Sequence, residues 1–427
     1  MDGRIIEYGE VLVRDGAICG VGDSIADLHP DEKVCDLGNA AILPGFVNAH
    51  SHIDYTLSRN VCDGLNLWDW IGSVGFRKDY IPEYETVLAS AMLGAAECVS
   101  TGITCLGDSS FTGIAAEAMD SAGLRGIVYR EIFGQSMGEQ YEEKFQHALD
   151  AVFAAQAKSS QHIKIGLSPH SVYTTSEQVF KLCAKSCAEL DIPISLHLAE
   201  TQAELDYLLH GNGPIAQWRR QLGYEPMIKE LTPARYLNEI GLLQKGVCLA
   251  HCVFISDEEI ELIAASNASV AHCPRSNAYL GTGIAPLTKL MASNVTVGLG
   301  TDSAGSCMRL DFFEEIRFTL GLQRAISKDA SVIMAKNVLE QATIGGAEAI
   351  GLSEIVGSLE VGKRADMIAV DLSGTLPGED IYLSVISRSP SDVVLTVVDG
   401  EEIARNGRPT KIDIDECKAA LMKCMEQ

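Results

Sequence analysis

The sequence predicts an α/β fold, in which a (β/α)8 barrel carries a small β-sandwich built from both ends of the chain. In the middle of the chain, short apolar runs alternate with amphipathic helical stretches, and eight such runs occur. At the two ends, short alternating segments are separated by turn signals such as Asp15-Gly16 and Asp399-Gly400. Eight β/α units are typical of a closed barrel of parallel strands.

Each predicted barrel strand is an apolar run that ends in a polar residue. The stretches between the runs have the periodicity of helices, for example 176–190 and 257–265. Ser256 before the second of these helices, with Glu259 three residues on, is a capping-box signature. The eight predicted strands are 41–49, 103–107, 126–133, 163–168, 192–198, 247–250, 269–273 and 295–300.

The pattern at the two ends of the chain predicts that both belong to one β-sandwich. Residues 5–22 and 365–406 hold the short alternating segments, so the chain should leave the sandwich near Asn39 and return to it near Gly357. We expect three parts: 1–43 as the first part of the sandwich, 44–356 as the barrel, and 357–427 as the rest of the sandwich with a C-terminal helix.

Composition excludes several classes of protein. The chain has 427 residues and is 47% hydrophobic, which is enough for a large core. A net charge of −25 argues against a nucleic-acid partner, since neutralising phosphates takes clustered Lys and Arg. No apolar stretch is long enough to span a membrane and the start lacks the pattern of a signal peptide, so we expect a cytoplasmic protein without a membrane partner.

The 13 cysteines are scattered and odd in number, which favours reduced thiols. Cys183 with Cys187, and Cys248 with Cys252, are four residues apart, but neither pair has a second Cys or His pair at the distance of a zinc ribbon. We therefore expect these four side chains to pack in the core.

Polar residues at the strand ends predict a metal site, because barrel enzymes place their chemistry at the C-terminal ends of the strands. His50 and His52 are two residues apart after an apolar run, so both imidazoles lie on one face of a strand. Neutral imidazoles suit zinc or iron. With His197 and Asp302 they make a plausible mononuclear site with room for a water. The strand-end candidates are His50, His52, His170, His197, Glu200, His251 and Asp302.

The other histidines have weaker support. His29, His147, His162 and His210 lack partners at ligand spacing, so we expect structural or solvent-facing roles. His272 ends the seventh run, and the pattern leaves open whether it lines the pocket or supports a ligand from behind.

Two further features bear on the pocket. A second metal usually needs a bridging group, often a modified lysine, at the end of the fourth strand. Lys164 stands early in that strand, which favours a single metal. Trp68, Trp70 and Phe76 follow the first strand, where they would either stack a heteroaromatic ring or cover the core.

Five motifs along nearly the whole chain resemble those of the amidohydrolase superfamily. The resemblance is to its aminohydrolase branch, which holds adenosylhomocysteine/methylthioadenosine deaminases, aminofutalosine deaminases, guanine deaminases and triazine chlorohydrolases. The motifs are PGFVNAHSH at 44–52, HLAET at 197–201, AHC at 250–252, GLGTDS at 298–303 and GSLEVGKRAD at 357–366.

The resemblance implies roles for the strand-end residues. His50, His52, His197 and Asp302 would bind one divalent metal ion, zinc or iron, that lowers the pKa of a bound water. Asp302 would take a proton from that water, Glu200 would protonate the ring nitrogen beside the attacked carbon, and His251 would stabilise the developing charge. Glu200 must be protonated to donate, so burial would have to raise its pKa.

The implied reaction is the release of ammonia from a small heterocyclic substrate. We expect a 6-aminopurine nucleoside type of substrate: adenosine, methylthioadenosine, adenosylhomocysteine or aminofutalosine. Members of the family are often oligomers, so we also expect a homo-oligomer. The residues that we expect to contact substrate are Asp79, Arg130, His170, Glu200, Trp68 and Trp70.

The chain departs from the family pattern in two places. Family members usually begin with one strand more before the stretch that matches residues 1–4, so we expect the sandwich to start late or to pair differently. Adenosylhomocysteine deaminases carry a Glu after the first strand and two Arg after the third; here Asp79 stands near the Glu and Arg130 matches the first Arg. Residues 137–141 hold no second Arg, which weakens recognition of a carboxylate. Short strings at 106–108 and 131–134, and at 197–200 followed by 208–214, are similar to aminofutalosine deaminases.

Two alternatives stay open. One is hydrolysis of another heterocycle, by deamination of guanine or another nucleobase, removal of a triazine chloride, or opening of a cyclic amide. Glu200 weighs against a chloride, which leaves without protonation. The other alternative is a non-catalytic scaffold, and the complete set of expected ligands argues against it.

Overall fold

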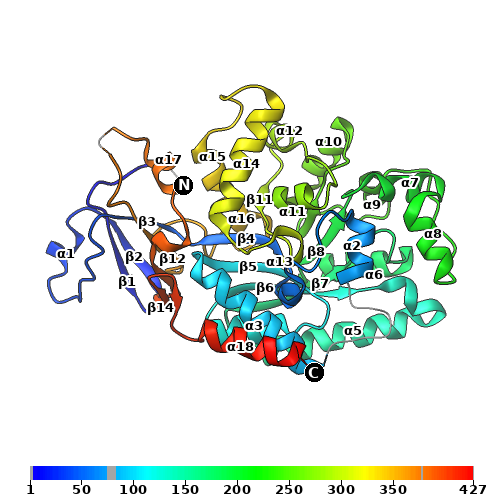
Figure 1. Cartoon of the computed structure of the whole chain (residues 1–427), viewed down its shortest axis with the longest axis horizontal. Helices are drawn as coiled ribbons and strands as arrows, with labels where there is room; N and C mark the ends of the chain where they lie inside the picture. Colours follow the sequence, from blue (N-terminus) through cyan, green and yellow to red (C-terminus); the bar gives the residue numbers. More distant parts are fainter. Residues whose placement is uncertain (1–2, 75–82, 377, 427) are drawn as a thin grey trace.

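Eight parallel strands form a barrel in the computed structural model, which describes residues 3–74, 83–376 and 378–426. Neighbouring strands pair in chain order, and a bridge between Ser51 and Asp302 brings the last strand to the first. The predicted barrel is thus confirmed (Figure 1). The strands are β4 (Phe46–Ser51), β5 (Ile103–Ser110), β6 (Arg125–Ile132), β7 (Ile163–Pro169), β8 (Ile194–Leu198), β9 (Val247–His251), β10 (Ser269–His272) and β11 (Val297–Leu299).

Helices surround the barrel, and α10 (Asp257–Ser266) begins at the capping box that the sequence predicts. Ser256 and Glu259 form a reciprocal capping box, and the helix predicted to follow Ser176 has that residue at its N-cap. Three 3-10 segments, Ile53–Ser58, Gly134–Gln140 and Pro390–Asp392, lie in the connections. The α-helices are α1 (Ile25–Leu28), α2 (Leu67–Val74), α3 (Tyr84–Ser100), α4 (Ala115–Ala122), α5 (Tyr141–Gln156), α6 (Glu177–Leu190), α7 (Gln202–His210), α8 (Gly213–Gln221), α9 (Pro233–Glu239), α10 (Asp257–Ser266), α11 (Pro274–Tyr279), α12 (Leu287–Ala292), α13 (Ala304–Cys307), α14 (Phe312–Ser327), α15 (Ala335–Gln341), α16 (Ile344–Ala349), α17 (Ile381–Ile386) and α18 (Ile414–Met425).

The two ends of the chain meet in antiparallel sheets beside the barrel (Figure 1). A hairpin of β1 (Glu10–Arg14) and β2 (Ala17–Gly22) attaches to the returning chain through an Ala17–Arg364 bridge. A five-stranded sheet has the order β15-β14-β13-β12-β3. We propose that residues 1–43 and 357–427 form the sandwich part of the protein and that residues 44–356 form the barrel. The strands of this sheet are β3 (Ala40–Pro44), β12 (Met367–Asp371), β13 (Val393–Val398), β14 (Glu401–Arg405) and β15 (Arg408–Pro409).

The prediction of a single strand at 41–49 is wrong, because this run forms two strands that belong to two different sheets. β3 belongs to the five-stranded sheet and β4 to the barrel, and Gly45 separates them. A Cβ at Gly45 would lie 2.1 Å from Oγ1 of Thr104, so only glycine lets the chain pass so close to β5. Apolar periodicity cannot locate such a change of sheet, because the apolar run continues from the end of β3 into the start of β4.

The barrel interior is a separate apolar cluster beneath the strand ends. Side chains from strands on different sides meet there, among them Val47, Ile127, Tyr129, Cys248 and Ala271, and α16 closes the lower end. Cys183 lies on α6 and belongs to the larger apolar cluster, which includes residues of both strands and helices. Cys183, Cys187, Cys248 and Cys252 are all free and buried, as predicted.

An ion-pair cluster joins the lower end of the barrel to the sandwich. Arg125 at the start of β6 donates two hydrogen bonds to Asp366 and one to Asp399. Arg364 and His162 also contact the Asp399 carboxylate. The chain therefore returns to the sandwich at a fixed orientation to the barrel. In the described part of the chain, none of the helices combines the length and the apolar character needed to cross a bilayer.

Candidate metal and catalytic site

His50 and His52 stand at the C-terminal end of β4, where the neighbouring strand β11 comes unusually close. A Cβ at Gly300 would lie 2.9 Å from the Cβ of His50, so glycine is needed at this approach. Asn48 ties the two strand ends together, since its side chain donates to Oγ1 of Thr301 and accepts the Thr301 N–H. These contacts bring Asp302 against the two histidines.

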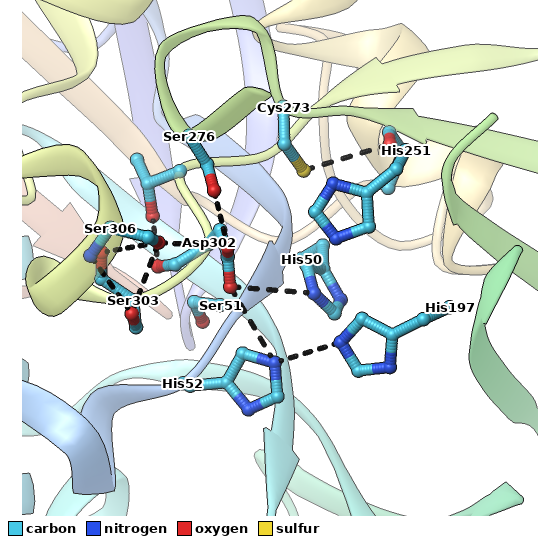
Figure 2. Close-up of polar contacts among 12 residues, drawn as sticks. His50, Ser51, His52, His197, His251, Cys273, Ser276, Asp302, Ser303 and Ser306 are labelled. Atoms are coloured by element: carbon cyan, nitrogen blue, oxygen red, sulfur yellow. Dashed lines mark hydrogen bonds and ion pairs between the residues drawn. The ribbon is translucent and has the colours of Figure 1, made fainter. Parts of the chain in front are cut away.

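The four predicted ligands converge on one small space (Figure 2). Nε2 of His52 lies 3.2 Å from Nε2 of His197. Oδ1 of Asp302 lies 3.8 Å from Nε2 of His50 and 3.6 Å from Nε2 of His52. One potential ligand atom each from His50, His52 and Asp302 lies within 4.8 Å of the others, and the same holds for His50, His197 and His251.

The chemistry of these nitrogens fits a metal ion. Both ring nitrogens of His50 are buried and have no hydrogen-bond partner among the described residues. Nδ1 of His197 faces the carbonyl oxygen of His170 at 3.1 Å; if it donates there, Nε2 of His197 is left with a lone pair. Burial and the neighbouring histidines lower the pKa of His50, and burial lowers that of His52 to about 4. Neutral imidazoles beside a carboxylate make a donor set suited to a divalent cation.

Asp302 is held as a carboxylate. Its Oδ2 accepts hydrogen bonds from Ser276 at 2.6 Å and from Ser306 at 2.8 Å, which leaves Oδ1 turned toward the histidines. Burial by itself would raise the pKa of Asp302, but His52, His251 and the Ser276 hydroxyl outweigh it and lower the pKa. Asp302 has φ +60°, a conformation that Asp and Asn adopt more readily than other side chains. The two serines were not among the predicted site residues.

Glu200 and His251 border the metal-binding space from the ends of β8 and β9. Oε1 of Glu200 lies 3.8 Å from Nδ1 of His251. The same nitrogen lies 2.9 Å from Oδ1 of Asn277, which fixes the orientation of the imidazole ring. Burial raises the pKa of Glu200 to about 8. At neutral pH its carboxyl group is therefore protonated and able to donate.

Glu204, which the sequence analysis did not single out, shapes the loop that carries Glu200. Its Oε1 accepts the Ala199 N–H at 3.0 Å and its Oε2 accepts the Glu200 N–H at 3.1 Å. Ala199 has φ +49°, a left-handed turn that reverses the chain after β8. The sequence carries a signal for this contact, because Thr201 and Glu204 have the spacing of a capping box.

His170 and Glu131 lie on the side of β6 and β7. One ring nitrogen each of His170 and His197 lies within 4.8 Å of the other and of a Glu131 carboxylate oxygen. A second metal is disfavoured here, because His197 would use one nitrogen for the first metal while its other nitrogen faces the His170 carbonyl. Nδ1 of His170 contacts the hydroxyls of Ser171 and Thr174, each at 3.0 Å.

Two buried carboxylates brace the segment after His52. Oδ2 of Asp108 accepts the Ser51 hydroxyl at 2.8 Å and the Ile53 N–H at 2.9 Å. Oδ2 of Asp54 accepts the Ser110 hydroxyl at 2.9 Å. Burial raises the pKa of Asp54 to about 6 and raises that of Asp108 well above its usual range. Neither residue was predicted, because a single acidic residue within an apolar stretch carries no distinctive spacing.

The other described residues predicted to contact substrate lie farther from the metal-binding residues or make contacts with the protein itself. Trp68 on α2 packs edge to face with Tyr173 at 5.3 Å, so it lies over the β7 end of the barrel. Trp70 donates its indole N–H to the Gly305 carbonyl at 3.2 Å. Arg130 donates to the Thr112 carbonyl at 2.7 Å, and its role in binding stays a prediction. Asp79 and Phe76 lie outside the described residues.

His272 is wholly buried, and neither of its ring nitrogens has a partner among the described residues. Burial lowers its pKa to about 3. Ala271 faces the barrel interior, so the alternation of β10 turns His272 toward the helical layer. The structure therefore favours a position of His272 outside the pocket, on the far side of the metal-binding residues, over a position in the pocket lining.

Comparison with known proteins gives one family. Residues 41–403 match the model of the amidohydrolase family. The 5-methylthioadenosine/S-adenosylhomocysteine deaminase of Thermodesulfovibrio yellowstonii is 32% identical, with 97% of this chain and 92% of that protein covered. The 5'-deoxyadenosine deaminase of Methanobrevibacter smithii is 30% identical, with 98% and 93% covered. The crystal structure of an adenosine deaminase from Xanthomonas campestris with bound zinc superposes with a TM-score of 0.84 at 28% identity, covering 99% of this chain and 94% of that one.

Proposed function

The chain belongs to the amidohydrolase family, and from that premise we propose that it removes the 6-amino group of an adenine nucleoside by hydrolysis. The observation that carries the proposal is the carboxyl group of Glu200. It is 5% exposed, and burial raises its pKa to about 8, so it is a proton donor at neutral pH. An amine leaves an aromatic ring only when the ring or the amine is protonated, so a buried acid beside the ligand cluster suits deamination.

The names of the relatives support this choice of substrate. Two relatives that align over nearly the whole chain are named for deamination of methylthioadenosine, S-adenosylhomocysteine or 5'-deoxyadenosine. All three compounds share an adenine base on a ribose and differ at the 5' position. The shared part is therefore the best candidate for what this site recognises: a neutral adenine nucleoside.

The site depends on a divalent metal ion, which we propose to be zinc held by His50, His52, His197 and Asp302. The donor set of three imidazoles and one carboxylate is typical of zinc, and the superposed adenosine deaminase contains zinc. When bound, such an ion lowers the pKa of a water molecule to about 7 and supplies a nucleophile at neutral pH.

The protein's own residues then move the protons. Asp302 accepts a proton from the attacking water through Oδ1, while Ser276 and Ser306 hold its Oδ2. Glu200 donates its proton to the ring nitrogen beside the amine-bearing carbon, which makes that carbon more electrophilic. His251, oriented by Asn277, lies where it can stabilise the oxygen added to the ring.

Collapse of the tetrahedral carbon completes the reaction. The amine takes the proton held by Asp302 and leaves as ammonia. The new hydroxyl returns its proton to Glu200 and becomes the carbonyl of the product, so the enzyme recovers both groups in their starting forms. His170 and Trp68 would contact the rest of the nucleoside, and Asp79, Arg130 and Trp70 remain proposed contacts.

An ammonia-release assay tests the proposal. Purified protein loaded with one equivalent of zinc should release ammonia from 5'-deoxyadenosine, methylthioadenosine or adenosine, and Glu200→Gln should lose the activity while it stays folded. Release from guanine only, or from none of a panel of nucleosides, nucleobases and triazines, would contradict it. A homo-oligomer and a cytoplasmic location stay predictions, which ultracentrifugation and cell fractionation test.

A further inference from the structure

Glu131 points into the barrel at the same end as the metal-binding residues. Ile127 and Tyr129 on β6 belong to the interior cluster, so the alternation of the strand turns Glu131 inward as well. Its side chain is buried, with the residue 8% exposed. A carboxylate oxygen lies within 4.8 Å of ring nitrogens of His170 and His197. Glu131 therefore borders the space in which a substrate would meet the metal site.

Glu131 differs from the neighbouring acids because neither of its side-chain oxygens receives a hydrogen bond from the described residues, whereas Asp54 and Asp108 each accept at one oxygen. Among the described residues, Glu131 and Glu200 are the buried acids that receive no hydrogen bond from protein. Glu200 already has a proposed role as proton donor, which leaves Glu131 as the acid in this space that is open to a hydrogen bond from a ligand. The buried carboxylates that do receive hydrogen bonds are those of Asp54, Asp108, Glu204, Glu259, Asp302, Asp311, Glu315 and Asp366.

The surroundings of Glu131 indicate which kind of donor fits. Phe133, two residues on, stacks on His170 with ring centroids 4.9 Å apart, and Phe111 packs against Phe133 at 5.7 Å. The nearby titratable side chains include several acids: burial raises the pKa of Glu131, and Asp54, Asp108 and Asp302 raise it further. An anionic group would be repelled here, whereas neutral hydroxyls beside aromatic faces are the pattern of a sugar site.

We propose that Glu131 binds a ribose hydroxyl of the substrate and is the residue by which this site selects ribonucleosides. The inference rests on the proposed function and extends it to the sugar. Glu200 follows β8, and Glu131 lies two strands away on β6, with His170 and His197 between the two carboxyl groups. A nucleoside whose base meets Glu200 can therefore present its sugar to Glu131 across the His170 side of the site.

Matched nucleosides test this inference. The wild-type protein should prefer adenosine over 2'-deoxyadenosine or 3'-deoxyadenosine in kcat/KM by about 10- to 100-fold, the usual cost of an unpaired hydrogen bond to a charged or buried group. Glu131→Ala should lower kcat/KM for adenosine by a similar factor and leave the deoxy analogue almost unchanged, so the preference disappears. Glu131→Gln keeps an oxygen that can accept the hydroxyl and should restore part of the preference.

A control separates sugar recognition from a structural role. Glu259 is also buried but closes a capping box on α10, so Glu259→Gln should leave the ratio of the two substrates unchanged. If Glu131→Ala lowers kcat/KM for adenosine and its deoxy analogues equally, Glu131 acts on the fold or the metal site and the inference is wrong. A wild-type protein that deaminates adenosine and both deoxy analogues equally also overturns it.

Failure of the inference can be told from failure of the proposed function. Calorimetric binding of inosine, 2'-deoxyinosine and 3'-deoxyinosine needs no turnover. The wild-type protein should bind inosine about 10- to 100-fold more tightly than one deoxy analogue, and Glu131→Ala should not. Ammonia release without sugar preference rejects the inference alone. Equal binding of all three products, with no deamination of any nucleoside, rejects both.

Discussion

The carboxylate of Glu204 accepts the backbone N–H of Glu200 at 3.1 Å, so one buried acid positions another. Its second oxygen accepts the N–H of Ala199, the residue in the left-handed turn. The carbonyl of Ala199 in turn accepts the N–H groups of Val253 and Phe254, just beyond His251. The proton donor and the His251 loop thus share a single backbone anchor.

Glu204→Gln should disturb this anchor, because the side-chain nitrogen of Gln cannot accept one of the two backbone N–H groups that the Glu204 oxygens accept. We expect kcat to fall about 10- to 100-fold with little change in KM, since a misplaced acid costs transition-state stabilisation more than binding. Glu259→Gln removes a similar helix-capping carboxylate away from the site and should leave kcat unchanged. Equal losses of kcat in the two variants would show that Glu204 only stabilises the helix.

The pH dependence of the reaction should report Glu200. Its pKa is raised to about 8 chiefly by burial, and the proposed mechanism needs the protonated form. The rate under kcat/KM conditions should therefore be level near neutral pH and fall about tenfold per pH unit above 8. A profile that stays level to pH 10, measured on protein shown to remain folded, would remove Glu200 from the role of donor.

Asp302→Asn should leave the protein folded and abolish turnover. Asn tolerates φ +60° and can still accept the hydroxyls of Ser276 and Ser306, so the free energy of unfolding should change by less than about 1 kcal/mol. An amide cannot accept the proton of water, so kcat should fall by about 10²–10⁴-fold. Calorimetry and ammonia release measure the two effects, and retained activity would refute the proton role of Asp302.

Arg125 should matter for stability and not for chemistry. Arg125→Met would leave Asp366, which is 2% exposed, with an unpaired buried charge at the junction of barrel and sandwich. Urea unfolding should show a loss of about 3–5 kcal/mol. Arg405→Met removes an exposed pair with Glu402 and should cost less than about 1 kcal/mol. Similar losses in the two variants would show that the cluster does not hold the junction.

The strands and their polar ends were predictable because apolar runs recur along the sequence and each run ends in a polar residue. Apolar runs of four to nine residues mark buried parallel strands, and a barrel brings every strand end to one face. That rule alone predicted that His50, His197 and Asp302, far apart in the sequence, would meet. The break at Gly45 was not predictable, since it depends on the approach of Thr104 from another strand.

The supporting polar residues escaped prediction for a related reason. Ser276 and Ser306 matter only because α11 and α13 bring their hydroxyls to Oδ2 of Asp302. Glu131 was not singled out, because only the tertiary structure brings it to His170 and His197. A partner formed through tertiary contact leaves no spacing in the sequence, whereas a helix cap does, as at Thr201 and Glu204.

Metal content tests the central claim most directly. The claim is that His50, His52, His197 and Asp302 hold one divalent ion, and elemental analysis of purified protein gives the number of ions per chain. We predict one equivalent of zinc, its loss in His52→Ala, and thermal unfolding at a lower temperature after chelation, because an ion that binds only the folded chain stabilises it. A chain that binds no divalent ion, or that still holds one equivalent in His52→Ala, would contradict the account.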